Sequence, residues 1–173
     1  PGAHSGTVGE AVSLQIAATN GNGDALTYSA TGLPAGLSIS ASGLITGTPS
    51  AAGTSSVTVT VSDGRGGTDS ETFSWTIAAA NVAPVLTNPG PQSGTVGEPV
   101  TALQLAATDG NAGDTLTFSA TGLPAGLSIT SGGLITGTPS AAGTASVTAT
   151  VNDGRGGTDS ETFSWTIAAA NVA

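Results

Sequence analysis

The chain has 173 residues and a formal net charge of −9, with two basic residues against eleven acidic ones. The absence of cysteine from the sequence excludes disulfides and thiolate metal sites. So few basic side chains predict no binding to nucleic acid, and no apolar run reaches the roughly 18 residues that membrane insertion requires.

The first predicted strand is residues 12–17, where apolar Val12, Leu14 and Ile16 alternate with polar residues. The segments that show such alternation in the first half of the chain are residues 12–17, 26–30, 57–61 and 73–77. Strands with one apolar face and one Ser/Thr face are typical of antiparallel sheets packed face to face. Glycine-rich residues 63–68 join the last two strands as a hairpin. The sequence therefore predicts an all-β fold with no helix longer than about one turn.

The tryptophans have a predicted place in this pattern. Trp75 is in register with Phe73 and Ile77, which puts it on the apolar face of its strand, and Trp165 is placed in the same way. A sugar-stacking platform needs an exposed ring, so this register favours core tryptophans over a carbohydrate site.

The chain contains an internal repeat with a period of about 90 residues. Residues 64–77 recur without change as residues 154–167, at an offset of 90, whereas residues 6–10 recur as residues 94–98 at an offset of 88. The difference requires two single-residue insertions in the second copy. Because the strand pattern runs through the whole period, each copy is predicted to be a complete domain.

The two insertions have predicted positions. One lies near Thr101 and Ala102, between two apolar residues of a predicted strand, and the other lies in residues 111–113. An extra residue within a strand turns the side chains on one flank to the wrong face unless it bulges out. The sequence therefore predicts a β-bulge at Thr101 and Ala102.

The period is close to the roughly 100 residues of an immunoglobulin-type sandwich. The predicted domains are residues 1–82 and residues 83–173, joined by a short linker in which Pro84 fixes the backbone. Near-identical tandem copies with short linkers are typical of long extracellular arrays. The predicted partners therefore include like modules in the same array.

A series of motifs within each copy resembles a known family. In the first copy, Leu33 and Pro34 begin a Leu-Pro-x-x-Leu loop, residues 47–49 form a Gly-x-Pro turn, and a valine-rich strand ends at Asp63. These motifs recur in the second copy, and together they resemble the putative-Ig and dystroglycan-type cadherin-like bacterial repeat modules. The resemblance implies two tandem Greek-key immunoglobulin/cadherin-like β-sandwiches from a secreted or cell-surface bacterial protein.

Loop residues with oxygen ligands predict a metal site. A seven-stranded Greek key places its loops alternately at two poles, so in a tandem pair the lower pole of one domain faces the upper pole of the next. The residues expected to gather there are Glu10, Asn81, Asp109, Asn111, Asp114 and Asp153. Calcium takes about 6–8 oxygen ligands, so these residues predict a Ca²⁺ site. Cadherins bind calcium at the equivalent place, but the linker here lacks their acidic run, which favours a single ion.

Two further aspects of this prediction stay open. The equivalent residues at the outer poles are expected to bind more weakly, because they lack neighbours from a second domain. These residues are Asn22, Asp24, Asp63 and Glu98. Asp-Gly and Asn-Gly pairs are also ordinary turn formers, so plain turns are the alternative to a calcium site.

Catalysis is not expected. His4 is the only histidine and its counterpart in the second copy is Gln92, so no repeated general base is present. The sequence predicts a structural or adhesive repeat module, rigidified by calcium, that contacts a cell-surface protein or polysaccharide. The alternative is a carbohydrate-binding appendage of a secreted polysaccharide-degrading enzyme.

Overall fold

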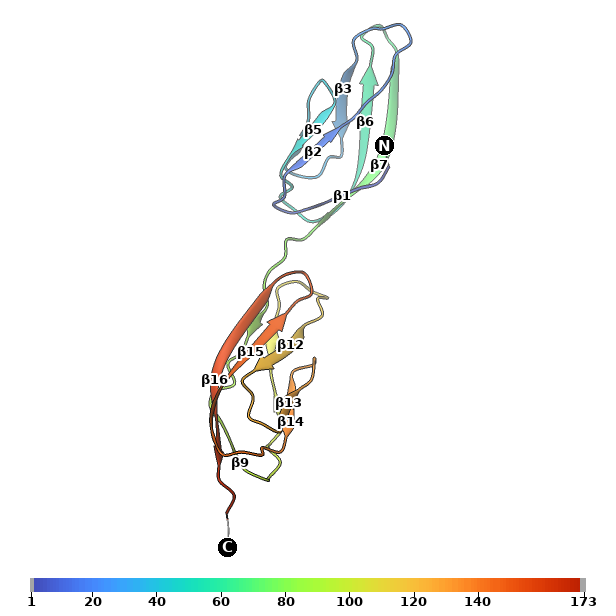
Figure 1. Cartoon of the computed structure of the whole chain (residues 1–173). Helices are drawn as coiled ribbons and strands as arrows, with labels where there is room; N and C mark the ends of the chain where they lie inside the picture. Colours follow the sequence, from blue (N-terminus) through green and yellow to red (C-terminus); the bar gives the residue numbers. More distant parts are fainter. Residues whose placement is uncertain (1, 172–173) are drawn as a thin grey trace. The chain divides into compact units, whose positions relative to one another are not determined.

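The computed structural model describes residues 2–171, and every regular element in that range is a β-strand. The chain divides into two compact units, Pro1–Ala80 and Asn81–Ala173 (Figure 1). The prediction of an all-β fold in two tandem sandwiches is therefore confirmed. The described residues contain no helix of the length and apolarity needed to cross a membrane.

The first unit is a sandwich of two sheets. Its strands are β1 (His4–Thr7), β2 (Val12–Gln15), β3 (Thr27–Thr31), β4 (Leu37–Ile39), β5 (Leu44–Gly47), β6 (Gly53–Ser62) and β7 (Thr68–Ala78). One sheet has the order β1-β7-β6-β3 and the other has the order β2-β5-β4. All pairs are antiparallel except β1 with β7, which run in parallel with His4 opposite Trp75 and Thr7 opposite Ala78.

The second unit repeats this architecture and adds a short pair of strands. Its strands are β8 (Val85–Leu86), β9 (Gln92–Thr95), β10 (Leu103–Gln104), β11 (Ala107–Thr108), β12 (Thr117–Thr121), β13 (Leu127–Ile129), β14 (Leu134–Gly137), β15 (Gly143–Asn152) and β16 (Thr158–Ala168). The sheets have the orders β12-β15-β16-β9 and β10-β14-β13, and β8 pairs with β11.

The core of each unit lies between its two larger sheets. In the long hairpins β6–β7 and β15–β16, alternate residues point inward, and most of their outward neighbours are Ser and Thr. Trp75 is 2% exposed and Trp165 is 1% exposed, so the prediction that both tryptophans are core residues is confirmed. Burial of these alternating apolar faces is the main force that holds each pair of sheets together.

The predicted bulge is present in the second unit. In the first unit Val12, Ser13 and Leu14 pair one to one with Gly47, Thr46 and Ile45. In the second unit the Val100 N–H donates to the Gly137 carbonyl at 3.0 Å, and Leu103 pairs with Ile135. Thr101 and Ala102 thus both oppose Thr136, and both are exposed. The bulge keeps Val100 and Leu103 on the core side, which confirms the register prediction.

The segment that leads into the second sandwich is part of its core. Leu86 of β8 is 3% exposed and Pro84 is fully buried. β8 pairs with β11, with Leu86 opposite Ala107, and the Thr87 N–H donates to the Ala106 carbonyl at 2.8 Å. In the aligned sequences Gly90 corresponds to Gly2, so the described part of the first unit contains no counterpart of β8.

Candidate metal centre

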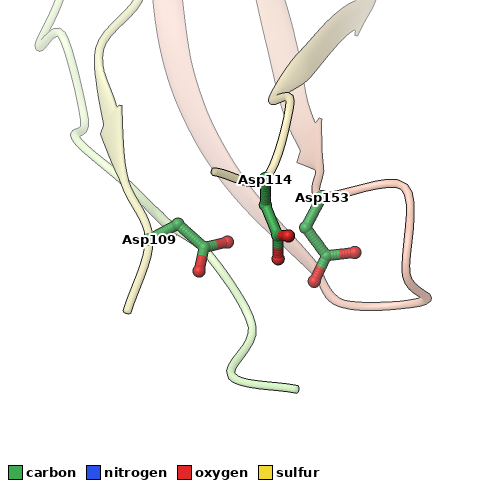
Figure 2. A group of neighbouring side chains, drawn as sticks. All are labelled: Asp109, Asp114 and Asp153. Atoms are coloured by element: carbon green, nitrogen blue, oxygen red, sulfur yellow. The ribbon is translucent and has the colours of Figure 1, made fainter. Parts of the chain in front are cut away.

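Two loops at one end of the second unit carry three aspartates that face one another. Asp109 directly follows β11, Asp114 precedes β12, and Asp153 directly follows β15. One carboxylate oxygen from each of these aspartates lies within 4.8 Å of the other two. Figure 2 shows the three carboxylates converging from separate segments of the chain. The sandwich thus brings together residues that are up to 44 positions apart in sequence.

Local hydrogen bonds hold two of these carboxylates in place. Oδ1 of Asp109 accepts the Asn111 N–H at 2.7 Å, as in an Asx turn. Oδ1 of Asp153 accepts the N–H groups of Arg155 at 2.7 Å and Gly157 at 2.9 Å. Asp109 and Asp153 are therefore ordinary turn formers through one oxygen each, so only the second oxygen of each carboxylate can take another role.

The remaining oxygens of this cluster are short of partners. Oδ2 of Asp109 and Oδ2 of Asp114 are excluded from solvent and have no hydrogen-bond partner among the described residues. The guanidinium of Arg155 approaches Asp114 at 3.4 Å, so one positive charge accompanies three carboxylates. Burying unpaired carboxylate oxygens costs several kcal/mol, and clustering like charges adds to that cost. A hard divalent cation bound by oxygen ligands would offset both costs, so these residues fit calcium.

Two asparagines join this cluster to the entry segment of the second unit. The Asn81 Nδ2 group donates to Asp153 Oδ2 at 2.7 Å, and the Val82 N–H donates to Asn111 Oδ1 at 2.6 Å. Asn81, predicted as an oxygen ligand, is thus a donor to the cluster in this structure. Rotating its amide by 180° exchanges nitrogen and oxygen, which would present an oxygen to a cation.

Of the two predicted glutamates, Glu98 lies away from the cluster and Glu10 belongs to the other unit. Glu98 follows β9, whose Thr95 pairs with Ala168 at the end of β16, whereas Asp153 lies just before the start of β16. Glu98 is therefore at the opposite end of the second unit from the cluster. Glu10 belongs to the first unit, where it is exposed in the turn after β1. Its participation in a calcium site stays a prediction.

The first unit has the same loops with fewer carboxylates. Asp24 pairs with Arg65 at 3.1 Å, and Asp63 Oδ1 accepts the N–H groups of Arg65 and Gly67, both at 2.8 Å. Asn20, not an aspartate, occupies the position of Asp109, and its Oδ1 accepts the Asn22 N–H at 3.1 Å. The first unit thus offers two carboxylates at this place, and weaker binding there stays a prediction.

The hydrogen bonds of Asp153 set its acidity. Its burial alone would raise the pKa of its carboxyl group, but donation from Asn81 and from the backbone N–H groups of Arg155 and Gly157 outweighs this effect. The pKa of Asp153 is therefore held below its ordinary value.

We expect this depressed pKa to make the second unit less stable in acid. A carboxylate whose folded pKa lies below its unfolded value of about 3.9 contributes stability that is full above that value. The contribution disappears as pH falls through the lower, folded pKa. Urea unfolding of the whole chain between pH 7 and pH 3, in chelator, should show Asp153→Asn destabilised near neutrality and converging with the parent chain in acid. Parallel curves would contradict this assignment.

The sequence alone did not single out two carboxylates that contact the segment entering the second sandwich. Asp159 Oδ2 accepts the Leu86 N–H at 2.8 Å, and Glu161 Oε2 accepts Nδ2 of Asn88 at 2.7 Å. Both occupy the same alternating positions as Phe163 and Trp165, which face the core. The sequence did carry a signal for these contacts, because acidic residues at inward-facing positions of a strand need hydrogen-bond donors from another segment of the chain.

The aromatic and histidine side chains serve the core. Both tryptophans are buried, so neither offers the exposed ring that stacking on a sugar requires. His4 packs edge-on against Phe73, with ring centroids 5.2 Å apart. This environment gives His4 a packing role in the first unit.

Comparison with known sequences supports the division of the chain into two modules of one family. A family model described as a putative Ig domain matches residues 1–78 and 83–168. The serine-rich adhesin for platelets of Staphylococcus aureus strain MSSA476 is 36% identical over 163 residues, covering 92% of this chain and 7% of the adhesin. The strain MRSA252 protein of the same name is also 36% identical, and 12% of its length is covered. The chain thus spans a small fraction of these relatives.

Comparison with solved structures shows the same fold in cadherins. Human protocadherin-24 EC1-2 superposes with a TM-score of 0.56 at 19% identity, covering 91% of this chain and 88% of that one. Drosophila N-cadherin EC1-4 gives a TM-score of 0.58 at 17% identity, covering 98% of this chain and 47% of that one. At such identities the likeness concerns the fold alone. From the family match over both units, we conclude that the chain belongs to the putative Ig domain family, with a cadherin-like sandwich fold.

Proposed function

We propose that the chain is a pair of structural, adhesive repeat modules from a larger bacterial cell-surface protein, without catalytic activity. The family match over both units and the similarity to staphylococcal adhesins support this function. Tandem duplication of one complete module is the expected arrangement for spacing or adhesion. We further propose that residues 1–82 and residues 83–173 fold independently, with like modules and a surface protein or polysaccharide as partners.

Calcium is proposed as the ligand of the second unit. The observation that carries this proposal is the pair of buried, unpartnered Oδ2 atoms of Asp109 and Asp114, which lie beside Asp153. Asn111 and the rotated amide of Asn81 would supply further oxygens. Because Asn81 and Val82 bond to the same cluster, an ion held there would order the segment that enters the sandwich.

Calcium is expected to raise the melting temperature of the second unit. Extracellular modules bind calcium with dissociation constants of about 10⁻⁴–10⁻³ M, so roughly 10 mM calcium adds about 1.4–2.7 kcal/mol to the stability of the folded state. For a domain of this size, that gain corresponds to about 5–20 °C. The measurement is differential scanning calorimetry of the whole chain in chelator and in calcium, together with isothermal titration of calcium.

The two copies supply matched controls for this measurement. Asp109→Asn gives the second unit the residue that the first unit has at Asn20, and it should remove most of the calcium effect. The reciprocal Asn20→Asp should strengthen calcium binding by the first unit. If the parent chain shows an unchanged midpoint and no heat of binding, these aspartates are turn formers and the calcium proposal is wrong.

A further variant tests the prediction about Glu10. If Glu10 supplies a ligand to the same ion, Glu10→Gln should weaken calcium binding by the whole chain. Glu98→Gln is the control, because Glu98 is the equivalent residue of the second unit and lies at the far end from the cluster. Equal affinities in the two variants would remove Glu10 from the site.

A further inference from the structure

Both Asn-Gly pairs of the sequence lie in one loop of the first unit, between β2 and β3. They are Asn20-Gly21 and Asn22-Gly23. An asparagine followed by glycine can lose its side-chain amide without an enzyme, because glycine has no side chain to keep its backbone nitrogen away from the asparagine carbonyl carbon. This deamidation turns a neutral amide into a carboxylate, so the loop can gain negative charge after the chain has folded.

The first pair is arranged for this reaction in the folded chain. Oδ1 of Asn20 accepts the Asn22 N–H at 3.1 Å, and the ring closed by this hydrogen bond includes the Gly21 nitrogen. The Asn22 N–H stabilises the negative charge that develops on Oδ1 when Cγ is attacked. Nδ2 of Asn20, the atom that leaves, has no hydrogen-bond partner among residues 2–171. The folded loop therefore favours attack by the Gly21 nitrogen on Asn20.

The second pair is held in a different way. The nitrogen that would attack Asn22 belongs to Gly23, whose N–H donates to the Asn20 carbonyl at 3.3 Å. The attacking nitrogen must give up its proton, and this hydrogen bond within the turn keeps the proton in place. Asn22 is therefore expected to react more slowly than Asn20, although the two pairs have the same sequence.

The reaction balances with water as its co-reactant. The Gly21 nitrogen loses its proton to hydroxide and forms a bond to Cγ of Asn20. The bond from Cγ to Nδ2 then breaks, and ammonia leaves behind a cyclic succinimide. Water opens this ring at either carbonyl, which gives aspartate or isoaspartate. Only the aspartate product keeps the original path of the backbone.

The second unit shows that the loop accommodates aspartate at this position. Asp109 occupies the position of Asn20, and its Oδ1 accepts the Asn111 N–H at 2.7 Å in the same kind of turn. The two carboxylates beside Asp109 have counterparts in Asp24 and Asp63 of the first unit. Conversion of Asn20 therefore supplies the carboxylate that the first unit lacks.

We propose that Asn20 is a site of spontaneous deamidation, and that its conversion to aspartate gives the first unit a set of three carboxylates like that of the second unit. The conversion needs no partner protein and advances with the age of the folded chain. Its consequence for calcium rests on the function proposed above: the first unit binds calcium more tightly once Asn20 has become aspartate.

The test follows the folded whole chain during incubation at mildly alkaline pH, where hydroxide speeds the attack. Conversion adds a negative charge and replaces an amide NH₂ by OH, so ion-exchange chromatography and mass spectrometry of proteolytic fragments measure its extent and its position. Asn20 should convert severalfold faster than Asn22 in the folded chain, and the two rates should approach each other in urea. No conversion at Asn20, or equal rates at both residues in the folded chain, would overturn the proposal.

Gly21→Ala is the matched control. The φ of Gly21 lies outside the left-handed region and an added Cβ meets nothing within 4 Å, so alanine fits without strain and hinders only the attacking nitrogen. This variant should keep the melting midpoint of the parent chain and slow the conversion of Asn20 severalfold. An unchanged rate would show that the Gly21 nitrogen is not the nucleophile, which is incompatible with the proposed reaction.

Calcium titration distinguishes this proposal from the function on which its consequence rests. The aspartate product, separated by chromatography from isoaspartate and unconverted chain, is compared with fresh chain and with Asn20→Asp. Equal gains in calcium binding for the converted chain and for Asn20→Asp support the proposal. A gain in Asn20→Asp alone would overturn the claim that deamidation completes the set of carboxylates. Conversion with no gain in either sample would contradict the calcium site and leave the deamidation of Asn20 standing.

Discussion

Trp165→Ala is expected to lower the free energy of unfolding of the second unit by about 3–5 kcal/mol. Trp165 is 1% exposed and contacts Phe163 with ring centroids 6.2 Å apart, so its removal leaves a large cavity between the sheets. With the modest stability of a small sandwich without disulfides, this loss approaches the whole stability of the unit. Urea unfolding of the whole chain, followed by circular dichroism, measures this loss, while the remaining fluorescence of Trp75 reports the first unit.

The duplicated tryptophan offers an internal control for that result. The first unit should unfold at an unchanged midpoint in Trp165→Ala, and Trp75→Ala should reverse the pattern. Trp165→Phe should cost much less, because it keeps most of the ring and removes an indole N–H that has no hydrogen-bond partner among residues 2–171. Equal losses from the phenylalanine and alanine variants would show that packing is not the reason for burying this side chain.

Gly126→Ala is expected to destabilise the second unit by about 2–5 kcal/mol. Gly126 is the third residue of the turn in which the Leu127 N–H donates to the Pro124 carbonyl at 3.1 Å, and its φ is +93°. A side chain there would adopt a disfavoured backbone conformation, and its Cβ would collide with the carbonyl oxygen of Thr138. The backbone itself would have to move to make room.

Gly154→Ala separates these two effects. Gly154 has a similar φ of +77°, but an added Cβ would meet nothing within 4 Å. Its substitution should therefore cost only the conformational penalty of about 1–2 kcal/mol. The measurement is the urea midpoint of the second unit in both variants. Similar losses at Gly126 and Gly154 would contradict the predicted collision.

The fold was predictable because its signals are local. Alternation at Phe163, Trp165 and Ile167 specifies which face of the strand is buried, and a single extra residue near Thr101 specifies the bulge. β8 was not predictable from alternation, because a two-residue strand has no measurable period. Its place depends on hydrogen bonds from Leu86 and Asn88 to carboxylates more than seventy residues away.

The candidate metal centre was predictable in part for a topological reason. A Greek key fixes which loops share a pole, so the sequence alone predicts that Asp109, Asp114 and Asp153 lie together. The orientation of the Asn81 amide was not predictable, because it depends on which atom of Asp153 is nearest. A contribution from Glu10 requires a specific placement of one unit against the other, which the sequence does not specify.

The parallel pairing of the first and last strands of each sandwich has a mechanical consequence. Because β1 and β7 run in the same direction, tension applied to the two ends of the first unit pulls these strands past each other along their length. The residue pairs from His4–Trp75 to Thr7–Ala78 then bear the load together in shear. Their hydrogen bonds are loaded at the same time and do not break one after another. β9 and β16 place the pairs from Gln92–Trp165 to Thr95–Ala168 in the same geometry. In a chain of such modules, each module resists extension through the same parallel pair of strands.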